Sequence, residues 1–380
     1  MKVLVISHTY IAPINREKWT TLAQLYNMVE ITVIVPKKWP GVLFSHEAKD
    51  LSVDTTKNCT FIALDTFKAG NEMIYRYHSK QLYKLIASIK PDIIHVEQGD
   101  KALSYFQAIV FAKTLKLPTK FLFFTWINWK PKLSLKHRLF WNLLTRFNLR
   151  STDGAIAGNA QAGELLRENG FAKPITVLPQ IGVNHHRFIP AVKDQAKKYI
   201  TYVGRMVEEK GIFLLLNAFA QLAAHFPSWH IRFIGSGPCK EALTQQAQQY
   251  AFHNKIEIGA TSDHHQVVPI LQKTDILVLP SYDTTDWREQ FGHVLIEAMA
   301  CGVAVIGSNA GEIPNVIADA GLIFEQKNER SLLAQLHALM QDEELRIMYG
   351  HKGRKRVELY YSHEAIAHQT YAYWQQLLSS

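Results

Sequence analysis

A loop near the middle of the chain carries two cations at a spacing suited to an anionic ligand. Gly204 and Arg205 follow an apolar run, and Lys210 comes five residues after Arg205, just ahead of a helical pattern that begins at Ile212. An arginine can donate two parallel hydrogen bonds to phosphate oxygens, and a lysine acts as a point charge. This loop therefore favours a diphosphate ligand.

A glycine pair follows the next apolar run of the same half. Gly235 and Gly237 flank Ser236, and the missing β-carbons would allow a flat or anionic ligand to approach the backbone. Many turns of this composition are only turns. The pair is thus a candidate ligand contact whose alternative is a plain loop.

Two glutamates mark a third loop and the helix after it. Glu289 precedes Phe291, Gly292 and His293, and Glu297 lies in the mostly apolar stretch 294–300. If a helix starts near Gly292, its free N–H groups suit a phosphate or a sugar hydroxyl. Both carboxylates could be ordinary surface groups, but an unpaired charge in an apolar stretch is costly. Carboxylates that accept hydrogen bonds from hydroxyl pairs are the preferred interpretation. Residues 309–314 form a fourth loop that we expect at the same edge.

Metal ligands are not expected from these motifs. The sequence has no Asp-x-Asp pair and no His-Glu-x-x-His, and its adjacent histidine pairs, at 185–186 and 264–265, lack ligand spacing. We therefore predict neither a metal nor another cofactor.

The elements that must position these loops alternate between strand and helix. Strand-length apolar runs occur at 3–7, 31–36, 93–96, 121–125, 154–157 and 175–179, and again at 199–204, 230–235, 255–259, 275–280, 303–308 and 321–324. Segments with helical periodicity, such as 74–89 and 102–115, separate several of them. Alternation of this kind is typical of parallel sheets covered by helices. Ligands of such sheets bind beyond the carboxyl ends of the strands, where the four loops fall.

Length and composition agree with two α/β domains. A chain of 380 residues, 47% hydrophobic and 20% charged, can bury two sizeable cores. The polar stretch 189–198 is the best linker, which gives an N-terminal domain over 1–188 and a C-terminal domain over 189–360. Three widely spaced cysteines indicate a reducing compartment, and the short apolar run at residues 3–6 predicts a buried strand rather than a signal peptide. No apolar run is long enough to cross a bilayer, so we expect a cytoplasmic protein.

The formal charge of +9 is unevenly distributed. No acidic residue occurs between Asp100 and Asp153. The cations of this interval are Lys101, Lys113, Lys116, Lys120, Lys130, Lys132, Lys136, Arg138, Arg146 and Arg150. Apolar residues at helical spacing, from Leu135 to Phe147, and nearby tryptophans suggest a basic amphipathic helix on an anionic membrane surface, with the segment 113–150 as the contact. A core-facing helix with a solvated basic face is the other interpretation.

With these residues assembled, the chain resembles the retaining glycosyltransferases of family 4. The resemblance covers nearly the whole length and is most specific from Tyr202 to Pro314. It implies the GT-B fold, with two Rossmann-like domains facing a cleft and a last helix, about 361–380, that returns to the first domain. It also implies a nucleotide-sugar donor on the second domain. Arg205 and Lys210 would then neutralise the diphosphate, Glu289 would hold the transferred sugar and Glu297 the ribose.

The first half departs from the family pattern. A histidine common after the fourth strand is replaced by the run 123–129, so Trp126 or Asn128 must fill its space. The loop with His8 and Tyr10 lacks the paired glycines often found there, and Gln290 stands where glycine is frequent. We take His8, Tyr10, Trp126, Asn128 and Asn159 as acceptor-side candidates; for Asn159 a turn-forming role is equally open.

Three functional hypotheses follow. The first is a metal-independent retaining hexosyltransferase that builds a cell-surface polysaccharide or glycolipid at the inner membrane face, on a saccharide or lipid-linked acceptor. The second keeps the fold but changes the reaction to phosphorolysis or nucleotide-sugar epimerisation. The third is a non-enzymatic protein that binds nucleotide sugars or polyanions. No nucleic-acid-binding signature accompanies the positive charge, so nucleic acid is not an expected partner.

Overall fold

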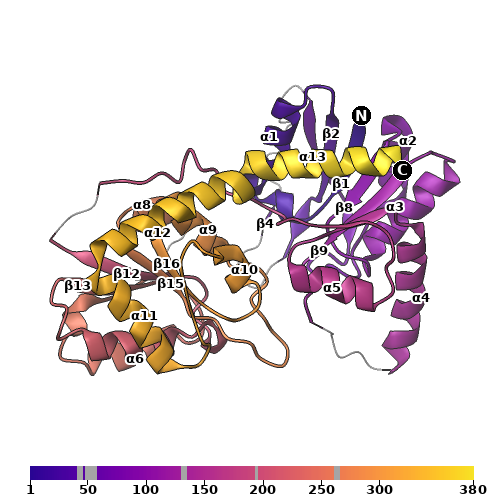
Figure 1. Cartoon of the computed structure of the whole chain (residues 1–380). Coiled ribbons are helices and arrows are strands. Elements are labelled where there is room, and N and C mark those ends of the chain that lie inside the picture. Colours follow the sequence, from indigo (N-terminus) through magenta and orange to yellow (C-terminus); the bar gives the residue numbers. More distant parts are fainter. Residues whose placement is uncertain (41–45, 48–57, 130–134, 193–195, 261–265) are drawn as a thin grey trace. The chain divides into compact units, whose positions relative to one another are not determined.

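The computed structural model describes residues 1–40, 46–47, 58–129, 135–192, 196–260 and 266–380. The chain divides into two compact units, the first formed by residues 1–182 and 363–380 and the second by residues 183–362. Each unit contains one large parallel sheet covered by helices (Figure 1). This is the predicted α/β class.

Within the described residues, unit 1 has a sheet of seven parallel strands in the order β11-β10-β9-β8-β1-β2-β5. Its strands are β1 (Lys2–Ile6), β2 (Glu30–Pro36), β5 (Cys59–Leu64), β8 (Ile93–Val96), β9 (Lys120–Thr125), β10 (Gly154–Ala157) and β11 (Ile175–Val177). Two short antiparallel pairs accompany it: β3 (Lys38–Trp39) with β4 (His46–Glu47), and β6 (Thr66–Phe67) with β7 (Arg76–Tyr77).

Helices cover both faces of this sheet. They are α1 (Glu17–Leu25), α2 (Ser79–Ile89), α3 (Leu103–Thr114), α4 (Leu135–Ser151), α5 (Ala160–Glu168) and α13 (His363–Ser379), with 3-10 turns at Thr9–Ile11 and Pro13–Arg16. Val3 and Val5 of β1 face one apolar cluster, and Leu4 and Ile6 face another. All four side chains are fully buried. Because β1 is buried on both faces, its sequence is an unbroken apolar run rather than an alternating pattern.

Unit 2 has a six-stranded parallel sheet among its described residues, in the order β14-β13-β12-β15-β16-β17. Its strands are β12 (Lys198–Val203), β13 (Trp229–Ile234), β14 (Ile256–Gly259), β15 (Ile276–Leu279), β16 (Ala304–Ser308) and β17 (Leu322–Phe324). Its helices are α6 (Ile212–Leu222), α7 (Lys240–Gln248), α8 (Val267–Gln272), α9 (His293–Ala300), α10 (Ile313–Ile317), α11 (Glu329–Gln341) and α12 (Glu343–Arg356), with 3-10 turns at Glu208–Lys210 and His253–Lys255 and a π-helical turn at Val357–Tyr361.

The C-terminal helix α13 belongs to unit 1. It packs along α1, as the yellow helix in Figure 1 shows. The Trp374 ring stacks on the Trp19 ring with a centroid distance of 5.7 Å and an interplanar angle of 3°. The Tyr373 hydroxyl accepts a hydrogen bond from the Ala155 N–H (3.0 Å) and donates one to the Pro174 carbonyl (2.7 Å). The last helix thus completes the core of the first unit.

The division between the units differs from the predicted boundary at 188/189. The Val183 N–H donates to the Tyr361 carbonyl (2.9 Å), and Arg354 donates to the carbonyls of His185 (3.3 Å) and Phe188 (3.1 Å). These bonds attach residues 183–188 to the second unit, so the first stretch of unit 1 ends at Gly182. The described parts of the predicted linker, residues 189–192 and 196–198, therefore lie inside unit 2, and residues 193–195 lie outside the described part of the chain.

The predicted helix over residues 74–89 is too long. Residues 76–77 form β7, and α2 begins at Ser79. Tyr75 and Tyr77 are both buried with one residue between them, which is the period of a strand. Gln107 exchanges hydrogen bonds with the backbone N–H and carbonyl of Tyr77 (3.0 and 2.8 Å), holding that segment extended.

Candidate functional site

The predicted donor loops meet at the switch point of the second sheet. Strand β12 pairs with β13 on one side and with β15 on the other, so the chain order reverses at this place. Loops that follow such neighbouring strands diverge and leave room for a ligand. The loops after β12 and β15 carry Lys210 and Glu289.

The glycine loops after β12 and β13 pack directly on each other. The Gly204 N–H donates to the Ile234 carbonyl (2.9 Å), and the Met206 N–H donates to the Ser236 carbonyl (2.8 Å). A β-carbon on Gly235 would lie 1.8 Å from the Gly204 oxygen, and one on Gly237 would lie 2.4 Å from the Met206 oxygen. The two glycines are therefore needed for the close contact between the loops. This packing explains their presence without a ligand.

Arg205 and Lys210 occupy different environments on the first loop. Arg205 is exposed, and its carbonyl accepts a hydrogen bond from the Tyr202 hydroxyl (2.6 Å). Burial, reinforced by the charge of Glu289, raises the pKa of Tyr202, which keeps this hydroxyl protonated as a donor. Lys210 ends a short 3-10 turn and is half-buried. The loop thus presents one exposed guanidinium and one partly enclosed ammonium.

Gly211 sets the path of the chain between Lys210 and α6. Its φ is +68°, in the left-handed region that glycine adopts most readily. A β-carbon there would lie 2.1 Å from the Pro280 carbonyl oxygen. The start of α6 therefore packs tightly against the end of β15, and this contact brings the Lys210 loop beside the Glu289 loop.

The Lys210 ammonium is ion-paired with the Glu289 carboxylate. Glu289 is 7% exposed and its Oε2 also accepts a hydrogen bond from the Ser281 hydroxyl at 2.8 Å. The Lys210 nitrogen lies 4.8 Å from the centroid of the Trp287 ring. A carboxylate with two donors and an adjacent aromatic face forms a preorganised polar site. Ser281 and Trp287 are members that the sequence motifs did not identify.

The fourth loop lies against the third, as expected. Gly311 has a φ of +51°, and a β-carbon there would lie 2.0 Å from the Glu289 carbonyl oxygen. That oxygen accepts a hydrogen bond from the Glu312 N–H (3.0 Å), and the Ser308 hydroxyl donates to the Ser281 carbonyl. These hydrogen bonds therefore fix the backbone at Ser281 and at Glu289.

The predicted start of the helix after Glu289 is confirmed. Gly292, with a φ of +82°, is the N-cap residue of α9, and His293 is its first residue. Glu297 lies in the second turn and is only 8% exposed. Phe291 is 5% exposed, and its ring lies 5.1 Å from the His293 ring and 5.6 Å from the Tyr361 ring. Phe291 thus packs under the helix start, whereas His293 and Glu297 line its first two turns.

The acceptor-side candidates all lie in unit 1. His8 stacks on Trp39 at 4.3 Å, and its Nε2 lies 3.4 Å from Glu72. Burial lowers the pKa of His8. Tyr10 is fully buried, so its ring is a core group rather than an exposed ligand contact. Asn128 donates to the Gln161 side chain at 3.2 Å.

Asn159 caps the helix α5. Its Oδ1 accepts a hydrogen bond from the Ala162 N–H at 2.7 Å, and its Nδ2 donates to the Trp126 carbonyl at 3.2 Å. Side chains of this type are preferred at N-cap positions. Of the two roles left open for Asn159, the structure shows the local one, in which it also holds the Trp126 backbone.

The described apolar side chains of the basic helix α4 differ in how much of their surface is exposed. Trp141 and Leu144 are each 7% exposed, whereas Leu143 is 61% exposed. Arg146 and Arg150 are exposed. The residues from 130 to 134 lie outside the described part of the chain. One face of the described helix therefore packs on the unit, while basic side chains and one leucine face outward.

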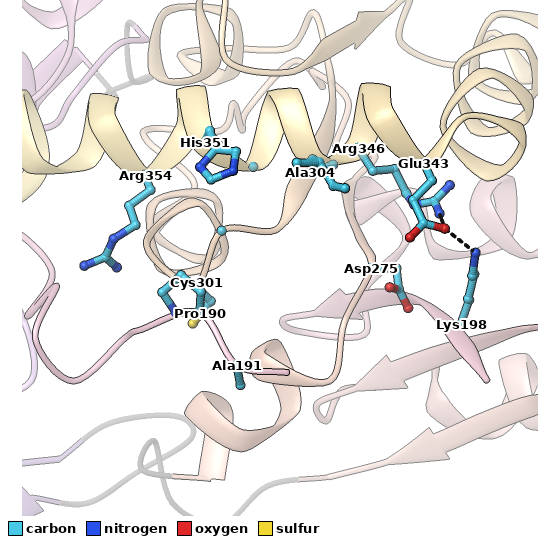
Figure 2. Close-up of a pocket in the computed structure, with 13 residues that line it drawn as sticks. Pro190, Ala191, Lys198, Asp275, Cys301, Ala304, Glu343, Arg346, His351 and Arg354 are labelled. Carbon is cyan, nitrogen blue, oxygen red and sulfur yellow. Dashed lines mark hydrogen bonds and ion pairs between the residues drawn. The ribbon is translucent and has the colours of Figure 1, made fainter. Parts of the chain in front are cut away.

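A separate cavity of about 260 Å³ lies at the amino edge of the second sheet (Figure 2). Lys198 and Ala304, the first residues of β12 and β16, line it together with α12. Glu343 Oε2 accepts hydrogen bonds from Lys198 (3.0 Å) and Arg346 (3.3 Å), so these charges are satisfied within the protein. None of the predicted donor residues lines this cavity.

Comparison with known proteins identifies the class. Two units that are each built on a parallel sheet flanked by helices define the GT-B fold. The structure of HepE from Anabaena in complex with UDP matches 99% of this chain and 100% of its own, with a TM-score of 0.71 and 14% identity. At that identity the likeness shows the fold alone.

Sequence profiles then give the family. The profile described as Glycosyl transferases group 1 matches residues 186–356, and the profile described as Glycosyltransferase Family 4 matches residues 22–187. The two matches adjoin and run through most of the chain. The protein belongs to this group 1 and family 4 type of glycosyltransferases.

Two curated relatives show the range of the family. A sulfoquinovosyl transferase of Arabidopsis thaliana is 26% identical over 302 residues, which is 74% of this chain and 56% of the relative. The capsular polysaccharide biosynthesis glycosyltransferase CapM of Staphylococcus aureus is 31% identical over 184 residues, 47% of this chain and 44% of the relative. The matches span about half the length of these relatives.

Proposed function

We propose that the protein transfers a sugar from a nucleotide-diphosphate sugar to a saccharide or lipid-linked acceptor. The donor would bind the loops at the carboxyl edge of the second sheet, and the acceptor would bind unit 1. The observation that supports this most is the meeting of Lys210 and Glu289 at the switch point of that sheet. In the proposed site, Lys210 would bind the diphosphate and the neighbouring Glu289 carboxylate would bind sugar hydroxyls.

Each donor residue has a proposed role. Arg205 and Lys210 would neutralise the diphosphate, assisted by the amino ends of α6 and α9. Glu289 would accept hydrogen bonds from hydroxyls of the transferred sugar, and Glu297 would hold the ribose diol. The Glu289 carboxylate is already oriented by Ser281, so little reorganisation is needed when the sugar arrives.

The proposed reaction retains the anomeric configuration and needs no metal. The bond between the anomeric carbon and the diphosphate oxygen breaks, and a bond from the acceptor oxygen forms on the same face. The acceptor proton passes to the leaving phosphate. Lys210 and Arg205 stabilise the charge that develops on that phosphate, which is the role a metal ion has in other transferases.

The name of the relative CapM supports a place in polysaccharide biosynthesis. HepE was solved with UDP, and the two curated relatives are a sulfoquinovosyl transferase and a capsular polysaccharide glycosyltransferase. A uridine nucleotide sugar is therefore the first donor to test. Retention and metal independence are tested by the anomeric proton couplings of the product and by turnover in EDTA. An inverted product, or loss of turnover in EDTA restored by a divalent ion, would overturn those two features.

We further propose a cytoplasmic protein that associates peripherally with anionic membranes through the segment 113–150. Among the described residues, no helix has both the length and the apolar character needed to cross a bilayer. The outward Arg146 and Arg150 and the exposed Leu143 on α4 support a surface contact. Co-sedimentation with vesicles that contain phosphatidylserine should decrease as salt rises. Absence of binding at low salt would reject the membrane contact.

A further inference from the structure

A fully buried carboxylate follows strand β8 in unit 1. The Glu97 side chain has no exposed surface, and its partner Lys18 is 2% exposed. Burial of an ionised carboxylate costs several kcal/mol unless its lone pairs are satisfied. Burial alone would raise the pKa of Glu97, but the nearby charge of Lys18 and hydrogen bonds from Gln180 and Tyr10 together lower it. Glu97 is therefore an anion in the folded protein.

The two oxygens of Glu97 accept hydrogen bonds from three different parts of unit 1. Oε1 accepts from the Lys18 ammonium of α1 at 2.9 Å. Oε2 accepts from the Tyr10 hydroxyl at 2.6 Å and from the Gln180 amide at 2.9 Å. Tyr10 lies in the 3-10 turn after β1, and Gln180 follows β11. The carboxylate thus connects segments far apart in the sequence.

Gln180 extends this network to the acceptor-side candidates. Its Nε2 also donates to the Thr9 hydroxyl at 3.1 Å, and its Oε1 accepts from the Trp126 indole N–H at 2.9 Å. The Trp126 ring lies over Gly158, where a β-carbon would be 2.0 Å from the ring. Trp126 is therefore held by its indole nitrogen and its face, while the Asn159 side chain holds its carbonyl.

These contacts gather at one edge of the first sheet. Thr9 and Tyr10 follow β1, Glu97 follows β8 and Trp126 follows β9. These strands are neighbours in the sheet, with β1 between β2 and β8, so their carboxyl ends form the switch point of unit 1. Loops at such an edge carry ligand-binding groups in open α/β sheets.

We infer that Glu97 is a positioning residue, whose ionised carboxylate acts through Gln180 and Tyr10 to fix Trp126 and the Thr9 loop for acceptor binding. This inference rests on the proposed function, because it assigns the acceptor to this edge. Glu97 itself is too deeply buried to touch an acceptor. It acts through the hydrogen bonds that Tyr10 and Gln180 donate to it, because an ionised carboxylate can only accept hydrogen bonds.

The test compares Glu97→Gln with the double variant Glu97→Gln/Lys18→Met. The single variant leaves the Lys18 ammonium buried without its counter-ion and is expected to fold less stably. The double variant removes both charges at similar volume and serves as the folded form. Glu343→Gln is the control, because it removes a half-exposed ion pair with Lys198 in unit 2.

The first measurement is the NMR signal of the Trp126 indole N–H, assigned by Trp126→Phe. We expect that signal to shift in the double variant because Gln180 loses its anionic partner, while the indole signals of Trp229 and Trp287 in unit 2 stay in place. An unchanged Trp126 signal in the folded double variant would overturn the inference. This measurement needs no substrate.

The second measurement separates acceptor from donor. With a UDP-sugar and the alkyl glycoside that the wild type uses fastest, the KM for the glycoside should rise about tenfold or more, as misplaced groups commonly cause. The affinity for UDP should stay within about twofold. An unchanged KM in the folded double variant would reject the positioning role. If the wild type uses no donor, the proposed function fails, and the Trp126 signal alone then decides whether Glu97 positions this loop.

Discussion

The Lys210 ammonium and the Glu289 carboxylate form an ion pair between loops that follow neighbouring strands, β12 and β15. Ser281 donates a second hydrogen bond to the same carboxylate oxygen. A diphosphate that reaches Lys210 competes with Glu289 for its charge. We therefore expect donor binding to loosen this pair and free Glu289 for sugar hydroxyls.

Substitution of Lys210 by alanine should weaken donor binding. Loss of one charge-assisted contact to a phosphate costs about 1.5 to 3 kcal/mol, which is roughly a tenfold to hundredfold rise in Kd. Calorimetric titration with UDP and a UDP-sugar measures this change. Lys198→Ala is the matched control, since Lys198 pairs with Glu343 at the opposite edge of the sheet. Equal affinities in both variants would remove Lys210 from the site.

Gly211→Ala should damage the donor site through the backbone. The new methyl group would meet the Pro280 carbonyl oxygen at 2.1 Å, at a φ of +68°. Gly170→Ala is the control, because Gly170 has a φ of +83° with no atom within 4 Å of the added carbon. It should therefore lose only about 1 kcal/mol of stability. Denaturant unfolding and UDP affinity are the measurements, and similar losses in both variants would contradict the close contact.

Trp374→Ala should destabilise unit 1, because Trp374 is fully buried and stacked on Trp19. Truncation of a buried tryptophan costs about 3 to 5 kcal/mol. Leu378→Ala, on the same helix but 40% exposed, should change the free energy of unfolding by less than about 1 kcal/mol. Urea unfolding of both variants tests whether α13 is an integral part of the first unit.

His95 should make stability depend on pH. Burial lowers the pKa of His95 to about 3. The nearby Glu97 charge opposes this shift, and the Lys18 charge adds to it. Between pH 6.5 and 3 the unfolded chain binds a proton that the folded protein does not, so the stability present above pH 6.5 is lost as pH falls. At pH 5 the loss is about 2 kcal/mol. The lowered pKa of Glu97 acts only at lower pH, below about 4.5.

The check is urea unfolding of wild type and His95→Leu at pH 7 and pH 5. Leucine removes the titrating group at similar volume in a site bounded by Trp19 and Trp374. The variant should lose less stability than the wild type between these two values. The same loss in both proteins would show that another group carries the pH dependence.

The strands were predicted well where burial on both faces leaves an uninterrupted apolar run, as in β1 and β15. Strand β5 was not predicted, although Cys59, Phe61 and Leu64 are buried, because its pattern of burial is neither continuous nor strictly alternating. The loops at the carboxyl edge of the second sheet could be predicted because glycines and charges follow those strands closely, and their donor role stays a prediction. Ser281 and Glu97 were missed, since a single serine or glutamate has no spacing pattern and gains meaning only from its neighbours in space.

The most direct test of the account is a panel of UDP-, GDP- and ADP-linked sugars, with release of free nucleotide measured for wild type and Glu289→Ala. The account predicts release from one donor by the wild type and its near-complete loss in Glu289→Ala, because the carboxylate that orients the transferred sugar is gone. Release at an equal rate by a folded Glu289→Ala protein, or no binding and no turnover of any donor by the wild type with acceptors present, would contradict it.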